Sequence, residues 1–296
     1  MPRYSYVNGR YLPHAEASVH IEDRGFQFAD GVYEVVSLIN GYIADEAGHL
    51  DRLERSLKEL RIALPMPRRA LKLVMREFAR RNRLKNAYIY IQVTRGVAPR
   101  DFKFPSGDIR PTLVITNLGN AVFNMDARKK ALKKAVTVPD IRWKRRDIKS
   151  TALVAQVLAK QAAVDKGAYE AWMVDDDGFV TEGASTNAWI VDKKGRLITR
   201  PTDKNMILKG VTRSSIQALC KKAGIKLVER PFTVKEAYKA AEAFTTAAGT
   251  MITPIVEVDG RKIGDGKLGA VTARILDLYF EYAADAKRKQ ERWDEK

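Results

Sequence analysis

The chain has 296 residues, of which 45% are hydrophobic and 30% charged, so it is long enough for one large or two medium globular domains. No run approaches the roughly 18 apolar residues of a membrane helix, and the N-terminus lacks the apolar core of a signal peptide, so we expect no membrane partner. The net charge of +17 is scattered over several predicted helices, which argues against a nucleic-acid partner, and the lone cysteine, Cys220, fits a reducing, cytoplasmic setting.

Residues 1–119 predict a small α+β domain in which strands and hairpins are followed by helices. Two Asn-Gly pairs are typical of two-residue hairpin turns, and a stripe of leucines at helical spacing predicts a helix. A second amphipathic helix follows, and alternating apolar residues then predict two strands. These features are the turns Asn8-Gly9 and Asn40-Gly41, the leucines Leu50, Leu53, Leu57 and Leu60, the helix 67–84, and the strands 88–94 and 112–116.

Residues 120–126 are expected to form an interdomain linker, because the sequence pattern changes after them, and residues 127–296 predict a larger α+β domain. The expected strands are 134–138, 169–174, 187–192 and 254–258. The expected helices are 150–166, 212–222, 234–240 and one that runs from about 267 into a charged tail. For helix 150–166 we expect Ser150 as the N-cap, with apolar positions recurring at helical spacing at Leu153, Val154, Val157, Leu158 and Ala162. Two domains with a cleft between them offer a common kind of ligand site.

Lys149 closes a strand-like and polar run and directly precedes the helix expected over 150–166. A lysine at a strand-to-helix junction lies near the positive end of the helix dipole. That field disfavours the ammonium form and favours a nucleophilic amine. Such an amine can form a Schiff base with an aldehyde cofactor. The alternative is a surface lysine in a basic segment.

Chemistry with pyridoxal phosphate also needs an acid near the ring nitrogen and an anchor for the phosphate. Glu182, the single carboxylate of the polar turn Thr181–Asn187, is either that acid or a solvated loop residue. Arg52 has no acidic residue three or four positions away, so it is either a phosphate ligand or a free surface arginine. Thr212 is the expected N-cap of a helix, where it could bind phosphate or merely cap the helix.

Two further residues are candidates for binding a substrate. Arg100 lies in a loop that follows a strand, where its guanidinium group could clamp a carboxylate or remain exposed. Tyr33 follows a glycine turn on a strand-like run, so its hydroxyl group could reach a ligand or its ring could be part of the core.

The combination of these motifs resembles the pyridoxal phosphate enzymes of fold type IV, and within them most of all the D-amino acid aminotransferases. The resemblance runs from about residue 4 to about residue 280 and implies an α+β fold of two domains with the cofactor in the cleft between them. Each motif is weak alone, but seven in the same order are specific. They are Glu22–Glu34, His49–Leu53, Val93–Gly96 with Pro99-Arg100, Asp140–Trp143, Asp147–Ser150, Thr181–Gly183 with Asn187, and Asn205–Arg213.

The resemblance implies that Lys149 holds pyridoxal phosphate as an internal aldimine and moves a proton between the substrate α-carbon and C4′ of the cofactor. Glu182 would face the pyridine nitrogen, and Arg52 would bind the phosphate. The other implied cofactor contacts are Asn187, Leu208, Val211, Thr212, Ala247 and Ala248. No metal is expected, because no cysteine–histidine cluster has zinc spacing.

On the substrate side, the resemblance implies that Tyr33 and Arg100 hold the substrate carboxylate and that His49 supports them. Members of the family are typically homodimers, so Arg100 could act on the ligand of a neighbouring subunit. Phe102 stands where D-amino acid aminotransferases usually carry a histidine, which removes one polar contact to the carboxylate. Ala247 and Ala248 stand where hydroxyl residues usually touch the phosphate, so backbone N–H groups would have to replace them.

The implied activity is transfer of an amino group from a D-amino acid such as D-alanine to a 2-oxo acid such as 2-oxoglutarate or pyruvate, with ping-pong kinetics. A branched-chain L-amino acid aminotransferase is the alternative, and an (R)-amine transaminase or an aminodeoxychorismate lyase would keep the same lysine. A basic binding protein without catalytic activity is a different class, and Lys149, Glu182 and Arg52 argue against it.

Overall fold

The computed structural model describes residues 3–121 and 123–285, and the chain divides into two compact units. The first unit contains the chain up to Phe123, the short segment Ile148–Ala152 and, of the described residues, also 283–285. The second contains Asn124–Asp147 and Leu153–Tyr282. The boundary after Phe123 lies within the expected linker 120–126, but helix α4 (Met125–Lys130) already begins there.

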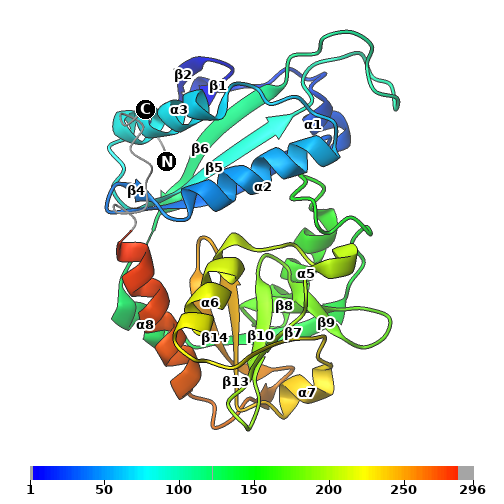
Figure 1. Ribbon diagram of the computed structural model, residues 1–296. Coiled ribbons are helices and arrows are strands. Elements are labelled where there is room, and N and C mark those ends of the chain that lie inside the picture. The colour runs from blue at the N-terminus through cyan, green and yellow to red at the C-terminus, as the bar shows by residue number, and fades with distance from the viewer. Residues whose placement is uncertain (1–2, 122, 286–296) are drawn as a thin grey trace. The chain divides into compact units, whose positions relative to one another are not determined.

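The first unit is built on a six-stranded antiparallel sheet with the strand order β2-β1-β6-β5-β3-β4. Two long helices, α2 and α3, lie against one face of this sheet (Figure 1). The strands are β1 (Tyr4–Val7), β2 (Arg10–Pro13), β3 (Gly31–Ile39), β4 (Tyr42–Ile43), β5 (Ala87–Thr94) and β6 (Thr112–Asn120). The helices are η1 (His14–Glu16), α1 (Arg24–Phe28), α2 (Glu46–Glu59) and α3 (Arg68–Arg81).

The core of the first unit lies between the helices and the sheet. Leu50, Leu53 and Leu57 recur every three or four residues, so they share one face of α2 and are all buried. Alternate residues of β5 point to the same side of the sheet and complete the core with Ile89 and Ile91. Both Asn-Gly pairs form the predicted turns with positive φ at each residue, as two-residue hairpins require.

The second unit contains a nine-stranded mixed sheet with the order β12-β11-β10-β13-β14-β7-β8-β9, and β15 pairs with β14. Its strands are β7 (Lys133–Pro139), β8 (Glu170–Val174), β9 (Val180–Gly183), β10 (Asn187–Val191), β11 (Leu197–Thr199), β12 (Leu227–Glu229), β13 (Glu242–Ala247), β14 (Met251–Val258) and β15 (Arg261–Lys262). Its helices are α4, α5 (Val154–Asp165), η2 (Asp203–Asn205), α6 (Val211–Lys222), α7 (Val234–Tyr238) and α8 (Ala270–Ala284). Figure 1 shows α6 beside β13, on which it packs.

The segment after Asp147 differs from the sequence-based prediction. Helix α5 begins at Val154, not at Ser150, and its N-cap is Leu153, which makes no side-chain capping bond. Ser150 instead forms a bridge with Val32, and Thr151 donates its N–H to the carbonyl of Gly31 at 3.0 Å. Backbone pairing with β3 therefore keeps Ile148–Ala152 out of the helix and in the first unit, although it was expected in the domain 127–296.

The apolar stripe expected on α5 is mostly exposed. Val154, Val157 and Leu158 are 74%, 63% and 55% exposed, whereas Ala159 and Ala163 are buried against β7 and β8. The helix is apolar on nearly all sides, so spacing alone did not identify the inner face. The small alanines are the residues that let the helix approach the sheet closely.

Helix α8 begins at Ala270 rather than near 267, and most of its expected charged tail lies outside the described residues. The sequence Thr233-Val-Lys-Glu236 has the spacing that predicts a capping box, and this capping box is present at the start of α7. Within residues 3–121 and 123–285, no helix combines the length and apolar character that crossing a bilayer would require.

Candidate active site

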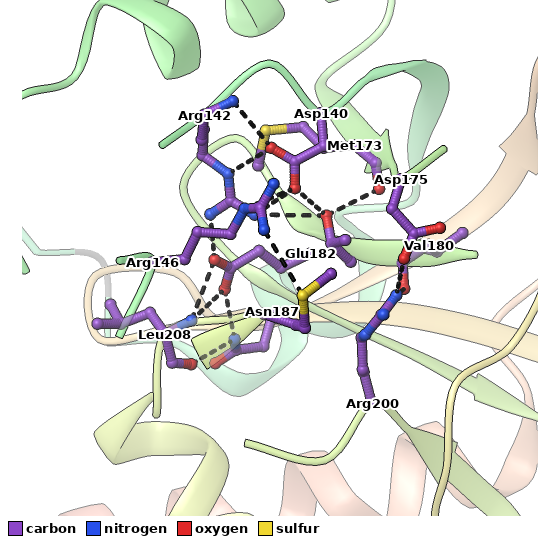
Figure 2. Close-up of polar contacts among 12 residues, drawn as sticks. Asp140, Arg142, Arg146, Met173, Asp175, Val180, Glu182, Asn187, Arg200 and Leu208 are labelled. Carbon is purple, nitrogen blue, oxygen red and sulfur yellow. Dashed lines mark hydrogen bonds and ion pairs between the residues drawn. The ribbon is translucent and has the colours of Figure 1, made fainter. Parts of the chain in front are cut away.

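Glu182 is buried in the second unit and receives hydrogen bonds at both carboxylate oxygens (Figure 2). Asn187 Nδ2 donates to Oε2 at 2.8 Å, and the backbone N–H of Leu208 points to both oxygens at 3.1 and 3.3 Å. Arg142 donates to Oε1 through a guanidinium nitrogen. Glu182 therefore lies on strand β9 as a fixed, buried carboxylate, and the alternative of a solvated loop residue is wrong.

Arg142 is held by a second carboxylate, that of Asp140. Its Nε and one terminal nitrogen bind the two oxygens of Asp140 at 2.9 and 2.7 Å, and Thr181 Oγ1 adds a bond of 2.7 Å to Asp140. Asp140 also forms an ion pair with Arg146 at 3.3 Å. The Arg142 side chain is only 5% exposed, so this forked pair lies almost entirely out of water.

Burial and the neighbouring charges act in opposite directions on the pKa values of the groups in this network. Burial raises the pKa of Glu182, and the positive charge and hydrogen bond of Arg142 work against that rise. For Asp140, burial acts in the same upward direction, but the bonds and charge of Arg142 hold its pKa below the usual range. Burial lowers the pKa of Arg142, yet the two carboxylates more than offset it and leave that pKa raised.

The start of helix α6 offers an anion site. The N-cap is Gly210, not Thr212 as expected, and no side chain caps this end. Thr212 is 3% exposed, and its buried Oγ1 has no hydrogen-bond partner. A buried hydroxyl without a partner at the positive end of a twelve-residue helix suits an oxyanion such as a phosphate group.

Gly210 packs closely against Asn187, the residue that binds Glu182. A Cβ atom at Gly210 would collide with Asn187 Oδ1, so glycine lets the α6 start approach this side chain. Asn187 Nδ2 also donates to the carbonyl of Leu208 at 3.0 Å. The structure thus brings Asn187 and Leu208 to Glu182, and Val211 and Thr212 lie in the first turn of the adjacent helix.

Ala247 and Ala248 end β13 and begin its turn to β14, and both are half-buried. Helix α6 packs on β13, so this turn belongs to the same unit as the α6 start. The neighbouring Thr246 accepts a hydrogen bond from Trp189 at 2.9 Å, so its hydroxyl is already engaged.

Lys149 lies in the first unit, half-buried, with its backbone paired to β3. Its carbonyl accepts the N–H of Tyr33 at 3.0 Å, and its Nζ lies 4.1 Å from the centroid of the Tyr33 ring. Tyr33 in turn stacks on Tyr90. Because α5 begins only at Val154, Lys149 is not at a helix N-terminus, so the expected dipole effect on its amine has no structural basis.

Arg52 is paired, contrary to the expectation from its helix neighbours. Its Nε and one terminal nitrogen bind the two oxygens of Glu34 at 2.7 and 2.8 Å, and His49 Nδ1 lies 2.8 Å from Glu34 Oε2. Glu34 comes from β3, so a search for acids on the helix itself could not find it. Burial acts against ionisation of Glu34, but Arg52 and His49 lower its pKa to about 2.

Arg100 and Phe102 both contact Phe28 in the first unit. The guanidinium carbon of Arg100 lies 4.6 Å from the centroid of the Phe28 ring, and the Phe102 ring centroid lies 5.5 Å from it. Phe102 is 86% exposed, and Arg100 is exposed too. The structure therefore groups Arg100 with Phe102 on an aromatic surface.

Three residues of the site were not given a role from the sequence: Asp140, Arg142 and Glu34. Asp140 and Arg142 are two residues apart just after β7, where the chain bends and Arg142 donates its backbone N–H to Asp140 Oδ1 at 3.2 Å. An aspartate two residues before an arginine in a turn was an available signal for this pair. Glu34 is a lone acid in the apolar run of β3, and a buried acid needs a cationic partner.

Comparisons with known proteins show the family of the chain. The family described as amino-transferase class IV matches residues 31–258. A D-alanine aminotransferase of Staphylococcus haemolyticus is 36% identical over 94% of this chain and 96% of its own length.

Solved structures give the same picture. The branched-chain amino acid aminotransferase of Escherichia coli superposes with a TM-score of 0.88 at 25% identity, over 99% of this chain and 98% of its own. A branched-chain amino acid aminotransferase of T.th., solved with pyridoxamine 5'-phosphate, gives a TM-score of 0.87 at 25% identity, with 99% and 98% covered.

Proposed function

The chain belongs to the amino-transferase class IV family, and from this membership we propose that it transfers an amino group from a D-amino acid, with D-alanine as the type donor, to a 2-oxo acid such as 2-oxoglutarate or pyruvate. It is a fold type IV aminotransferase that depends on pyridoxal phosphate. The observation that carries the choice of substrate is the 36% identity, over nearly the full length, to a D-alanine aminotransferase.

The residues of the second unit fit the cofactor. A buried, ionisable Glu182 suits the pyridine nitrogen, and the partnerless Thr212 hydroxyl at the α6 start suits the phosphate. When bound, pyridoxal phosphate supplies an aldehyde for an amine and a ring that stabilises negative charge at the substrate α-carbon. Asn187 and Leu208 would hold Glu182 in place, and Val211, Ala247 and Ala248 would contact the cofactor alongside them.

Lys149 is the proposed catalytic residue. Its Nζ would hold the cofactor aldehyde and, once released, would take the proton of the substrate α-carbon and return one. The Tyr33 ring beneath Nζ and the β3 pairing of its backbone restrict where that nitrogen lies. A proton acceptor that is already held in position loses less conformational entropy when the reactive arrangement forms, which lowers the barrier.

Substrate and phosphate recognition are assigned to residues of the first unit. Arg52, fixed by Glu34, would bind phosphate with its guanidinium, and His49 would support it through the same carboxylate. Tyr33 and Arg100 would bind the substrate carboxylate. Phe102 would contribute apolar surface where a polar contact is usual, which favours tolerance toward the substrate.

A branched-chain L-amino acid aminotransferase is the second candidate, because proteins of that name share the fold with a TM-score of 0.88. The Escherichia coli protein is 25% identical to this chain, which is lower than the 36% of the D-alanine aminotransferase. Sequence identity tracks the residues that line a site more closely than backbone similarity does, so the D-amino acid assignment is preferred.

We further propose that the protein works as a homodimer in the cytoplasm. Cys220 is the single cysteine of the chain and is fully buried, and burial raises its pKa to about 11. It therefore forms no disulfide within the chain that an oxidising compartment would be needed to maintain.

An assay with paired donors tests the function. The purified protein with added pyridoxal phosphate is given 2-oxoglutarate and either D-alanine or L-leucine, and chiral chromatography identifies the amino acid formed. We expect D-glutamate from D-alanine and little product from L-leucine. L-Glutamate formed from L-leucine, with D-alanine inert, would instead support the branched-chain enzyme.

A further inference from the structure

Arg142 is the side chain that joins the two buried carboxylates of the second unit. It donates a hydrogen bond to Glu182 and two further hydrogen bonds to the two oxygens of Asp140 (Figure 2). Glu182, Asp140 and Arg142 are each at most 6% exposed at the side chain. Water therefore contributes little to their solvation, and each charge depends on its neighbours.

The charges facing Glu182 in this unit balance only when Arg142 is present. Asp140 and Glu182 contribute two negative charges, and Arg142 and Arg146 contribute two positive ones, of which Arg146 pairs with Asp140. The other donors to Glu182, Asn187 and the Leu208 N–H, are neutral. Without Arg142, the one remaining cation would be Arg146, which pairs with Asp140. The buried Glu182 carboxylate would then face no positive charge of its own and would take up a proton.

We propose that Arg142 is a positioning residue of the transamination: anchored on Asp140, it fixes the Glu182 carboxylate and keeps it ionised. This inference rests on the proposed function, because the negative charge of an ionised carboxylate is what stabilises a positively charged, protonated pyridine nitrogen. Arg142 itself acts through Glu182. Asp140 serves as the anchor that keeps the guanidinium from turning away from Glu182.

The electrostatics of the site agree with this role. Burial is the largest influence on the pKa of Glu182 and raises it, while the charge of Arg142 is the largest influence that lowers it. The Asp140 charge adds a further rise. Loss of Arg142 would thus remove the largest influence that lowers the pKa of Glu182.

The test is an infrared pH titration of the protein loaded with pyridoxal phosphate. The C=O stretch of a protonated carboxylic acid is followed in wild type and in Arg142→Met, and Glu182→Gln identifies the Glu182 band. Arg200→Met is the matched control, because Arg200 is a buried arginine paired with Asp175 at 2.7 Å and makes no contact with Glu182 among the described interactions. Arg142→Gln, which removes the charge but keeps donors for both acids, serves if Arg142→Met does not fold.

We expect the pH at which Glu182 loses its proton to rise by about one unit or more in both neutral variants, a tenfold change or larger in proton affinity. Arg142→Lys, which keeps the positive charge, should largely restore the wild-type midpoint. The pH profile of kcat should shift in the same order, with KM for the amino donor little changed.

An unshifted Glu182 midpoint in Arg142→Gln or Arg142→Met would overturn the inference, as would an equal shift in Arg200→Met. The visible absorption of the same samples reports bound cofactor. Wild-type protein that shows no such absorption would overturn the proposed function as well, whereas normal absorption with an unshifted carboxyl band would overturn the role of Arg142 alone.

Discussion

At the scale of single residues, Glu182 and Thr212 are buried polar groups that differ in whether the protein itself supplies their hydrogen-bond partners. Thr212 buries a hydroxyl without a partner, and Glu182 buries a carboxylate. Unsatisfied buried polar groups cost roughly 1–3 kcal/mol each. Glu182 is fully hydrogen-bonded within the protein, whereas the Thr212 hydroxyl at the α6 start is the group that a polar ligand would complete.

Replacement of Lys149 by alanine should abolish transamination. The proposed mechanism needs its Nζ both to hold the cofactor and to move the α-proton, so kcat should fall by roughly 10³-fold or more. Steady-state rates with D-alanine and 2-oxoglutarate measure the effect. Lys144→Ala, in the same basic segment but exposed, is the control and should keep wild-type rates. Equal losses in the two variants would contradict the assignment.

Thr212→Val should separate cofactor binding from stability. Valine removes the partnerless hydroxyl at nearly constant volume, so the unloaded protein should be as stable as wild type or more stable. Affinity for pyridoxal phosphate should fall roughly tenfold to hundredfold, since a hydrogen bond to a charged group is lost. Titration with the cofactor and urea unfolding measure the two effects. Thr245→Val, at another buried hydroxyl without a partner, should leave the affinity unchanged.

At the scale of secondary structure elements, the sequence predicted the features that depend on neighbouring residues, such as turns, caps and helix faces. It did not predict the features that depend on contacts between residues far apart in the chain. The leucine stripe of α2, the Asn-Gly hairpins and the α7 capping box are local, and all are confirmed. The start of α5 is wrong because β3 captures Ile148–Ala152 through backbone pairing. The partner of Arg52 was missed for the same reason, since Glu34 lies on β3, eighteen residues before it.

The β3–α2 ion pair predicts an acid-sensitive contribution to stability. Glu34 has a pKa of about 2 in the fold against an ordinary value of 4.5, so its contribution is fully present above about pH 4.5 and is lost as the pH falls through 2. Glu34→Gln should lower the free energy of unfolding by about 3 kcal/mol near neutral pH. The difference from wild type should shrink toward pH 2 in urea unfolding. A difference that does not change with pH would contradict this account.

The corrected orientation of α5 can be tested by a pair of substitutions. Ala163→Leu adds volume where the helix meets the sheet and should destabilise the fold by about 1–3 kcal/mol. Val157→Ser changes a side chain that is 63% exposed and should stay within about 0.5 kcal/mol of wild type. Chemical denaturation measures both. The reverse order would show that the stripe expected from the sequence is the inner face after all.

At the scale of the whole molecule, the order of motifs along the chain carried more information than any motif alone. Seven weak patterns in the family's order were enough for the fold and the type of chemistry, and the class IV match over residues 31–258 agrees. The network of Asp140, Arg142 and Glu182 could be assembled only in three dimensions, because β8 and α5 separate its members in sequence.

The most direct test of the central claim is the visible absorption spectrum of the purified protein, read before and after addition of D-alanine or L-leucine. We expect a yellow band from pyridoxal phosphate bound to Lys149 that bleaches with D-alanine and persists with L-leucine. A band that bleaches only with L-leucine would contradict the D-amino acid assignment. The absence of any band, even after pyridoxal phosphate is added, would contradict the cofactor assignment itself.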